Sequence, residues 1–165
     1  MLITKQKGYW RIKKKMEWLR IVLVLMILTR AIYTDIKNGI IENRCMVYGL
    51  ISAGLYTALY KGGTGLLQSI KMSVVMLVVL FALFVLKGLG AGDIKLFCVL
   101  AAFYQRDAIG IVVVSFLVAA GLAIVKMLIR IVRGEQFYLK GETMNFSIPI
   151  GIATIVIESM KWVKL

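Results

Sequence analysis

The chain has 165 residues, of which 61% are hydrophobic, and its formal net charge is +13. With a mean hydropathy of +0.88, it is more apolar than an ordinary soluble domain, in which about half of the residues are apolar, and this excludes a soluble globular enzyme. The basic residues lie mostly at the N-terminus and between apolar blocks. This distribution is typical of topology signals and of contacts with the anionic headgroups of a lipid bilayer, and it predicts no nucleic-acid partner.

Long apolar blocks between short polar stretches predict an all-α, polytopic bundle of about six transmembrane helices. A basic segment, residues 1–17, is expected to lie at the membrane interface ahead of a membrane domain over residues 18–165. The second and fourth blocks are shorter than the ~20 residues that cross a bilayer, so they would tilt, thin the bilayer or begin in a re-entrant loop. In chain order, the blocks cover residues 18–34, 45–60, 66–86, 94–104, 108–129 and 146–163.

Histidine is absent from the sequence, which narrows the possible chemistry. Its absence excludes zinc sites of the HExxH type, Ser–His nucleophilic pairs and histidine proton relays. The two cysteines, Cys45 and Cys98, have no metal-ligand spacing and are expected to pack as small apolar residues. We therefore predict no metal and no cofactor, and any hydrolysis would depend on other side chains, carboxylates above all.

Two aspartates adjoin the apolar blocks. Asp35 follows the first block, and Asp93 closes the glycine-rich string of residues 88–93. A carboxylate at mid-bilayer costs roughly 2.5–3.5 kcal/mol, so its presence in such a chain is a functional signal. Because two predicted spans separate them, both aspartates would lie at the same membrane face. The basic loops at that face place it in the cytoplasm of a plasma-membrane protein, whereas the basic N-terminus favours the opposite orientation.

Two neighbouring carboxylates can hydrolyse a peptide bond without histidine or metal. Repulsion between the charges raises the pKa of one of them, which then carries a proton while its partner stays ionised. The ionised partner takes a proton from the attacking water, and the protonated partner donates to the peptide carbonyl oxygen. Taken alone, however, Asp35 is also explained as a helix-end acid paired with Arg30 or Lys37.

The glycines ahead of Asp93 allow an unusual backbone. Gly90 and Gly92 lack a Cβ, so the chain there can turn sharply, adopt positive φ and approach a bound peptide closely. The alternative is a tight turn between two helices, with Asp93 as the N-cap of the second.

Three segments carry a resemblance to a known family. Residues 90–95 (GAGDIK) resemble the GxGDxK motif of the type IV prepilin peptidase and preflagellin peptidase family of membrane aspartic peptidases. Residues 35–43 resemble its first-aspartate segment, an Asp at a helix end followed by a run ending Ile-Pro-Asn, with Glu42 in place of the proline. Residues 146–151 (FSIPIG) resemble the beginning of its last helix. The resemblance extends from about residue 18 to the end.

The resemblance implies a short, peptidase-only membrane aspartic endopeptidase that removes short basic leader peptides from pilin-like precursors at the cytoplasmic face. Without a CxxC motif, no N-methylation is expected. Lys95 would neutralise the added negative charge, contact substrate or extend to the interface. The residues carried over are the catalytic pair Asp35 and Asp93 and the substrate-loop residues Gly90, Gly92, Lys95 and Asn43.

The sequence alone leaves other classes of protein possible. The same acids would suit a non-catalytic membrane assembly protein or a small ion transporter. A presenilin-like peptidase that cuts within the bilayer is a nearer alternative. A basic leader would also need compensating acid near the site, for which Glu42, Glu135 and Glu142 are the candidates.

Overall fold

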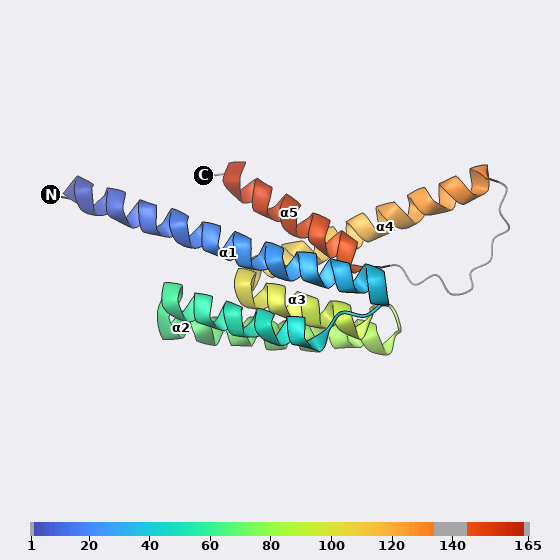
Figure 1. The fold of residues 1–165 in the computed structure, drawn as a ribbon, viewed down its shortest axis with the longest axis horizontal. Helices are drawn as coiled ribbons and strands as arrows, with labels where there is room; N and C mark the ends of the chain where they lie inside the picture. The colour runs from blue at the N-terminus through green and yellow to red at the C-terminus, as the bar shows by residue number, and fades with distance from the viewer. Residues whose placement is uncertain (1, 134–144, 164–165) are drawn as a thin grey trace.

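The computed structural model describes the backbone of residues 2–133 and 145–163, and the side chains of residues 14–133 and 145–161. Within these residues every regular element is helical, which confirms the predicted all-α class (Figure 1). The elements are α1 (Leu2–Asn38), α2 (Asn43–Val85), α3 (Ala91–Tyr104), the 3-10 helix η1 (Gln105–Asp107), α4 (Ala108–Val132) and α5 (Ser147–Val163).

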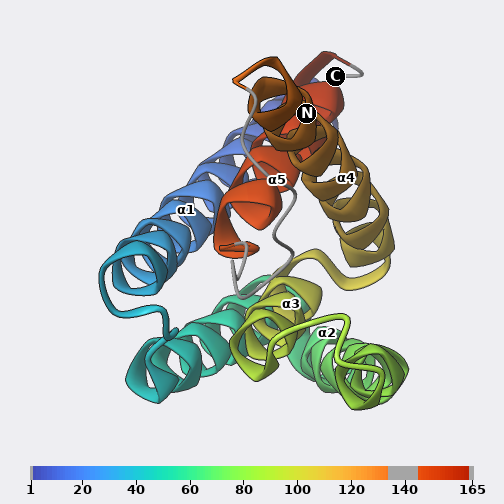
Figure 2. The same ribbon diagram turned by 90° about the vertical axis from the view of Figure 1, so that its right-hand side faces the viewer.

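The helices form two layers (Figures 1 and 2). One layer contains α1, α5 and α4, with α5 in the middle; we call it the upper layer. The other contains the two halves of α2 with α3 between them, and we call it the lower layer. Helix α3 is enclosed by its neighbours, and every residue from 96 to 105 is buried. A helix that is apolar all round suits such an enclosed place.

The first half of α2 runs in the same direction as α3. At its beginning, Asn43 accepts a hydrogen bond of 2.7 Å from Lys95 in the second turn of α3. At its far end, Lys61 donates a bond of 2.7 Å to Gln105, just after α3 ends. The helical conformation is then interrupted at Gly62, whose φ of 69° is one that residues with a side chain rarely adopt.

Beyond Gly62 the second half of α2 returns along α3 in the opposite direction (Figure 1). The Ser69 hydroxyl donates to the Ala102 carbonyl at 2.8 Å, and four residues later the Ser73 hydroxyl donates to the Cys98 carbonyl at 2.9 Å. The glycine-rich turn predicted between the second and third blocks is therefore the point at which the chain reverses.

The surface of the bundle is strongly apolar. Two stretches, Asn43–Val85 and Ala91–Val132, are long and apolar enough to cross a membrane, with mean hydropathies of 2.2 and 2.8 over their most apolar parts. Only 17% and 22% of those parts is buried inside the protein, whereas the core helix of a soluble protein would be mostly buried. Together with exposed side chains such as Leu59 and Val132, this indicates a membrane protein. The count of about six spans stays a prediction.

The first helix is longer than predicted. We expected it to end at residue 34, with Asp35 directly after it, but α1 continues to Asn38 and Asp35 lies in its last turns. The helix ends at Gly39, which has φ of 64° and donates its N–H to the Asp35 carbonyl at 2.9 Å, a left-handed glycine cap. Residues 1–17 show no break from the rest: α1 begins at Leu2. Their position at a membrane interface stays a prediction.

Candidate functional site

Asp35 and Asp93 line one cavity of about 730 Å³, although they are far apart in the sequence. Asp35 is contributed by the end of α1 and Asp93 by the beginning of α3. The connection between α2 and α3 adds Lys87 and Gly90, and Phe146 closes the side next to α5. The cavity therefore lies at one end of the bundle, between the upper and lower layers, where both carboxylates face the same space.

Asp35 is only 8% exposed, and its carboxylate is bonded to a hydroxyl group. The Oγ of Ser147, the first residue of α5, donates to Asp35 Oδ2 at 2.5 Å. The N-terminus of α5, the positive end of its dipole, therefore lies beside this carboxylate. The alternative pairing with a nearby base is wrong: Arg30 is paired with Glu42 at 3.2 Å, and Lys37 donates to the Tyr33 hydroxyl.

Asp93 is the third residue of α3, and the N-cap of that helix is Gly90. The N-cap alternative for Asp93 is therefore wrong. Its carboxylate instead turns back and accepts the N–H of Gly90, the way an acidic residue in this position satisfies a free donor at a helix start. Gly90 leaves space for this, because a Cβ there would lie 2.9 Å from Asp93 Oδ2.

The pKa of Asp93 is raised to about 6. Burial is the main cause, the negative charge of Asp35 adds to it, and the Gly90 N–H acts in the opposite direction. Asp93 precedes the apolar stretch of residues 94–104, so this carboxyl belongs to the polar end of the bundle. Asp93 therefore keeps its proton to a higher pH than an ordinary aspartate does.

The predicted positive φ at the two motif glycines is wrong. Gly90 has φ of −74°, and Gly92 lies inside α3. In this connection the positive φ falls on Lys87, at 56°. Gly92 lies close to another part of the protein, since a Cβ there would lie 3.2 Å from that of Ile41, in the connection between α1 and α2. The close approach to a bound peptide stays a prediction.

Lys95 and Asn43, predicted to lie at the substrate loop, contact each other. The Lys95 ammonium donates to Asn43 Oδ1, and both side chains are exposed. This bond fixes the start of α2 against α3 just beyond Asp93. Glu135 and Glu142, the other acids expected to meet a basic leader, lie outside the described residues.

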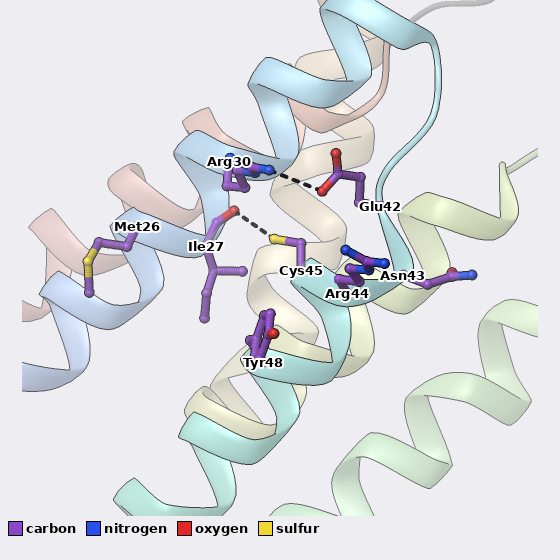
Figure 3. Close-up of a pocket in the computed structure, with 8 residues that line it drawn as sticks. All are labelled: Met26, Ile27, Arg30, Glu42, Asn43, Arg44, Cys45 and Tyr48. Carbon is purple, nitrogen blue, oxygen red and sulfur yellow. Dashed lines mark hydrogen bonds and ion pairs between the residues drawn. The ribbon is translucent and has the colours of Figure 1, made fainter.

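A second cavity, of about 820 Å³, lies beside the first, between α1 and the beginning of α2 (Figure 3). The Arg30–Glu42 pair lines this cavity together with Ile27, Arg44 and Tyr48. Glu42 is the one acid among its lining residues, so this cavity has no carboxylate pair for hydrolysis.

Glu42 replaces the proline that the family resemblance leads one to expect, yet the backbone has the conformation of a proline. Its φ is −62° and its ψ is 130°, and proline fixes φ near −65°. The backbone at residue 42 is therefore one that a proline could adopt, and the Glu42 side chain pairs with Arg30.

Ser147 is the residue of this site that sequence reasoning missed. The segment from Phe146 to Gly151 was identified as the beginning of the last helix, but its hydroxyl was given no role. The available signal was its position: α5 begins at the bundle end where α1 ends, so a polar group in its first turn faces the acid at the end of α1.

Comparison with known proteins agrees with the resemblance. The profile of the type IV leader peptidase family matches residues 21–126, a range that includes Asp35 and Asp93 and covers more than half of the chain. Comparisons with curated proteins and with solved structures give no match. The family implies a peptidase with pilin-like precursor substrates. The resemblance inferred from the three motifs is thus confirmed, and the chain belongs to the type IV leader peptidase family.

Proposed function

We propose that this protein is an aspartic endopeptidase that removes leader peptides from pilin-like precursors, with Asp35 and Asp93 as its catalytic pair. The observation that carries the proposal is the single cavity that both carboxylates line. Family membership supports the reaction class, and the raised pKa of Asp93 supports a pair in which one acid holds a proton.

The pair would act on a water molecule held between the two acids. The ionised carboxylate accepts a proton as the water oxygen bonds to the scissile carbonyl carbon, and the protonated acid donates to the carbonyl oxygen. This gives a tetrahedral diol with no net change in protons. As the C–N bond breaks, the first acid passes its proton to the leaving amine nitrogen and the second recovers one from a hydroxyl of the diol. Both acids return to their starting states.

The loop residues have supporting roles in this proposal. Gly90 lets the Asp93 carboxylate turn back to its own backbone, and Gly92 lets the loop carrying Ile41 lie directly on α3. The Lys95–Asn43 bond holds that arrangement beside the cavity mouth.

The aspartate end of the bundle is proposed to face the cytoplasm. At this end Lys87 lies on a connection, and the helix turns next to the connections carry Lys37, Arg44 and Lys95. Basic residues gathered in this way are the distribution that positive-inside orientation requires. A cysteine placed at exposed Lys87 in a Cys45→Ala, Cys98→Ala background should react with a membrane-impermeant maleimide only after the cells are opened. Labelling of intact cells would show that this end of the bundle faces the outside.

Cleavage by the purified protein tests the proposal directly. The full chain is reconstituted in liposomes with a panel of pilin-like precursors, and wild type is compared with Asp35→Asn and Asp93→Asn. Each variant should lose cleavage by about a thousandfold or more while it keeps its helical content and elution volume.

A matched control comes from Asp107→Asn, an acid at the opposite end of the bundle that pairs with Lys161 at 2.6 Å. This variant should cleave like wild type. If both site variants cleaved normally, or if wild type cleaved none of the precursors, an assembly protein or ion transporter would be the better description.

A further inference from the structure

Ser147 makes a hydrogen bond to a carboxylate, whereas the other buried serine and threonine side chains on the described helices donate to backbone carbonyls, Ser69 to that of Ala102 on α3. Ser115, Thr154 and Thr57 each donate to a carbonyl of their own helix, four residues earlier. Ser147 is the first residue of α5, so no residue of that helix lies four positions before it. Its hydroxyl, which is fully buried, instead donates to the carboxylate of Asp35 on α1.

The bond makes the two aspartates chemically unequal. Asp35 receives an O–H donor at 2.5 Å and lies at the positive end of α5. Asp93 receives the backbone N–H of Gly90 and is opposed by the charge of Asp35. The remaining charged group that lines the cavity is Lys87. On α1 itself, the charge of Lys37 is directed to the Tyr33 ring, 5.6 Å from its centroid.

We infer that Ser147 is a positioning residue of the proposed peptidase, whose hydroxyl fixes Oδ2 of Asp35 so that Oδ1 accepts the proton of the attacking water. Asp35 is then the general base and Asp93 the general acid. This inference rests on the proposed function, and it assigns to each carboxylate a role that a pair of equal acids would not have.

Kinetics of Ser147→Ala test the inference. With the hydroxyl removed, kcat should fall by about 10- to 100-fold with little change in KM, because the substrate is still bound but the base is less well directed. The acid limb of the kcat–pH profile should move upward, because the carboxylate loses a hydrogen-bond donor. Ser147→Thr, which keeps the hydroxyl, should recover most of the activity.

Ser115→Ala is the matched control, because Ser115 is also fully buried but bonds within its own helix. It should leave both kcat and the pH profile unchanged. A kcat loss without a pH shift, equal in Ser147→Ala and Ser115→Ala, would mean that Ser147 is merely structural and would overturn the inference.

A second measurement needs no substrate. In an Asp93→Asn, Asp107→Asn background, Asp35 is the one aspartate left, so infrared spectra of protein with labelled aspartate report its protonated carboxyl as pH is lowered. The band of the protonated Asp35 carboxyl should appear at higher pH when Ser147→Ala is added. If the pH at which this band appears did not change, the inference would be contradicted, even if the variant were too unstable for kinetics. If Asp35→Asn and Asp93→Asn abolish cleavage but Ser147→Ala alters neither rate nor titration, the inference fails while the proposed function stands.

Discussion

Arg20 on α1 and Glu158 on α5 form a largely buried ion pair, with 2.7 Å between Arg20 Nη2 and Glu158 Oε1. The Arg20 guanidinium also lies over the ring of Tyr104, 4.9 Å from its centroid. Because α1 and α5 run in opposite directions, this pair and the Ser147–Asp35 bond tie the same two helices together at different heights (Figure 1). The position of Asp35 relative to α5 is therefore fixed at two points.

Removing one charge of this ion pair should destabilise the protein more than removing both. Glu158→Gln leaves the Arg20 charge buried without its counter-ion, and we expect it to lower the free energy of unfolding by about 3–5 kcal/mol. Replacing both residues, as Arg20→Met with Glu158→Leu, should restore most of that loss. Thermal unfolding in detergent measures both changes. A double variant as unstable as the single one would show that the charges have a role beyond their mutual neutralisation.

The raised pKa of Asp93 makes its ionisation a cost to the folded state above about pH 6. A carboxyl whose folded-state pKa is raised stabilises the fold below its unfolded pKa, near 4, and that contribution is lost as the pH rises through the folded value. Asp93→Asn should therefore be more stable than wild type by about 1–2 kcal/mol at about pH 7.5, and the difference should vanish near pH 4. Melting curves across this pH range check the sign. A variant less stable than wild type at neutral pH would contradict the burial of this charge.

Gly90→Ala should impair the site without unfolding the protein. Its Cβ would lie 2.9 Å from Asp93 Oδ2, so the carboxylate must turn away from the Gly90 N–H and from its place in the cavity. We expect cleavage to fall by about 10- to 100-fold. Gly121→Ala in α4, where a Cβ meets nothing within 4 Å, is the control and should keep full activity. Equal activity of both variants would show that the carboxylate tolerates displacement.

Glu42→Pro should be accepted by the fold. The backbone at residue 42 already has a φ near that of proline, while the Arg30–Glu42 pair that would be lost is exposed and weak. The free energy of unfolding should change by less than about 1 kcal/mol, and cleavage should continue. Glu42→Gln separates the two effects, because it removes the ion pair and leaves the backbone unrestrained. A large loss of stability or of cleavage in Glu42→Pro alone would mean that the loop needs a conformation that proline forbids.

The sequence was sufficient for the helical class, for the reversal near Gly62 and for the expectation that both acids lie at one end of the bundle. These features depend on local signals: apolar length, glycine runs and the number of reversals between two positions. The continuation of α1 to Asn38 was missed because charged residues are tolerated at a helix end, so the glycine cap at Gly39 was the better signal.

The contacts between helices could not be predicted. Ser147 in the first turn of a helix resembles any helix-start serine, and only the packing of α5 against α1 gives its hydroxyl a carboxylate partner. Glu158 and Arg20 likewise belong to apolar stretches far apart in the chain, and their pairing depends on the register between two helices. Which charged residues meet is a property of tertiary packing, for which a single sequence carries little information.

The two-layer arrangement places one aspartate on each side of a seam. Asp35 belongs to the upper layer and Asp93 to the lower. Near the cavity, the ring of Phe97 on α3 contacts that of Phe146, with their centroids 6.3 Å apart. The distance between the two carboxyl groups thus depends on how the upper and lower layers pack against each other, and not on the folding of either layer. Replacing Phe97 or Phe146 by a larger or smaller side chain would widen or narrow the gap between the carboxyl groups while leaving every helix intact.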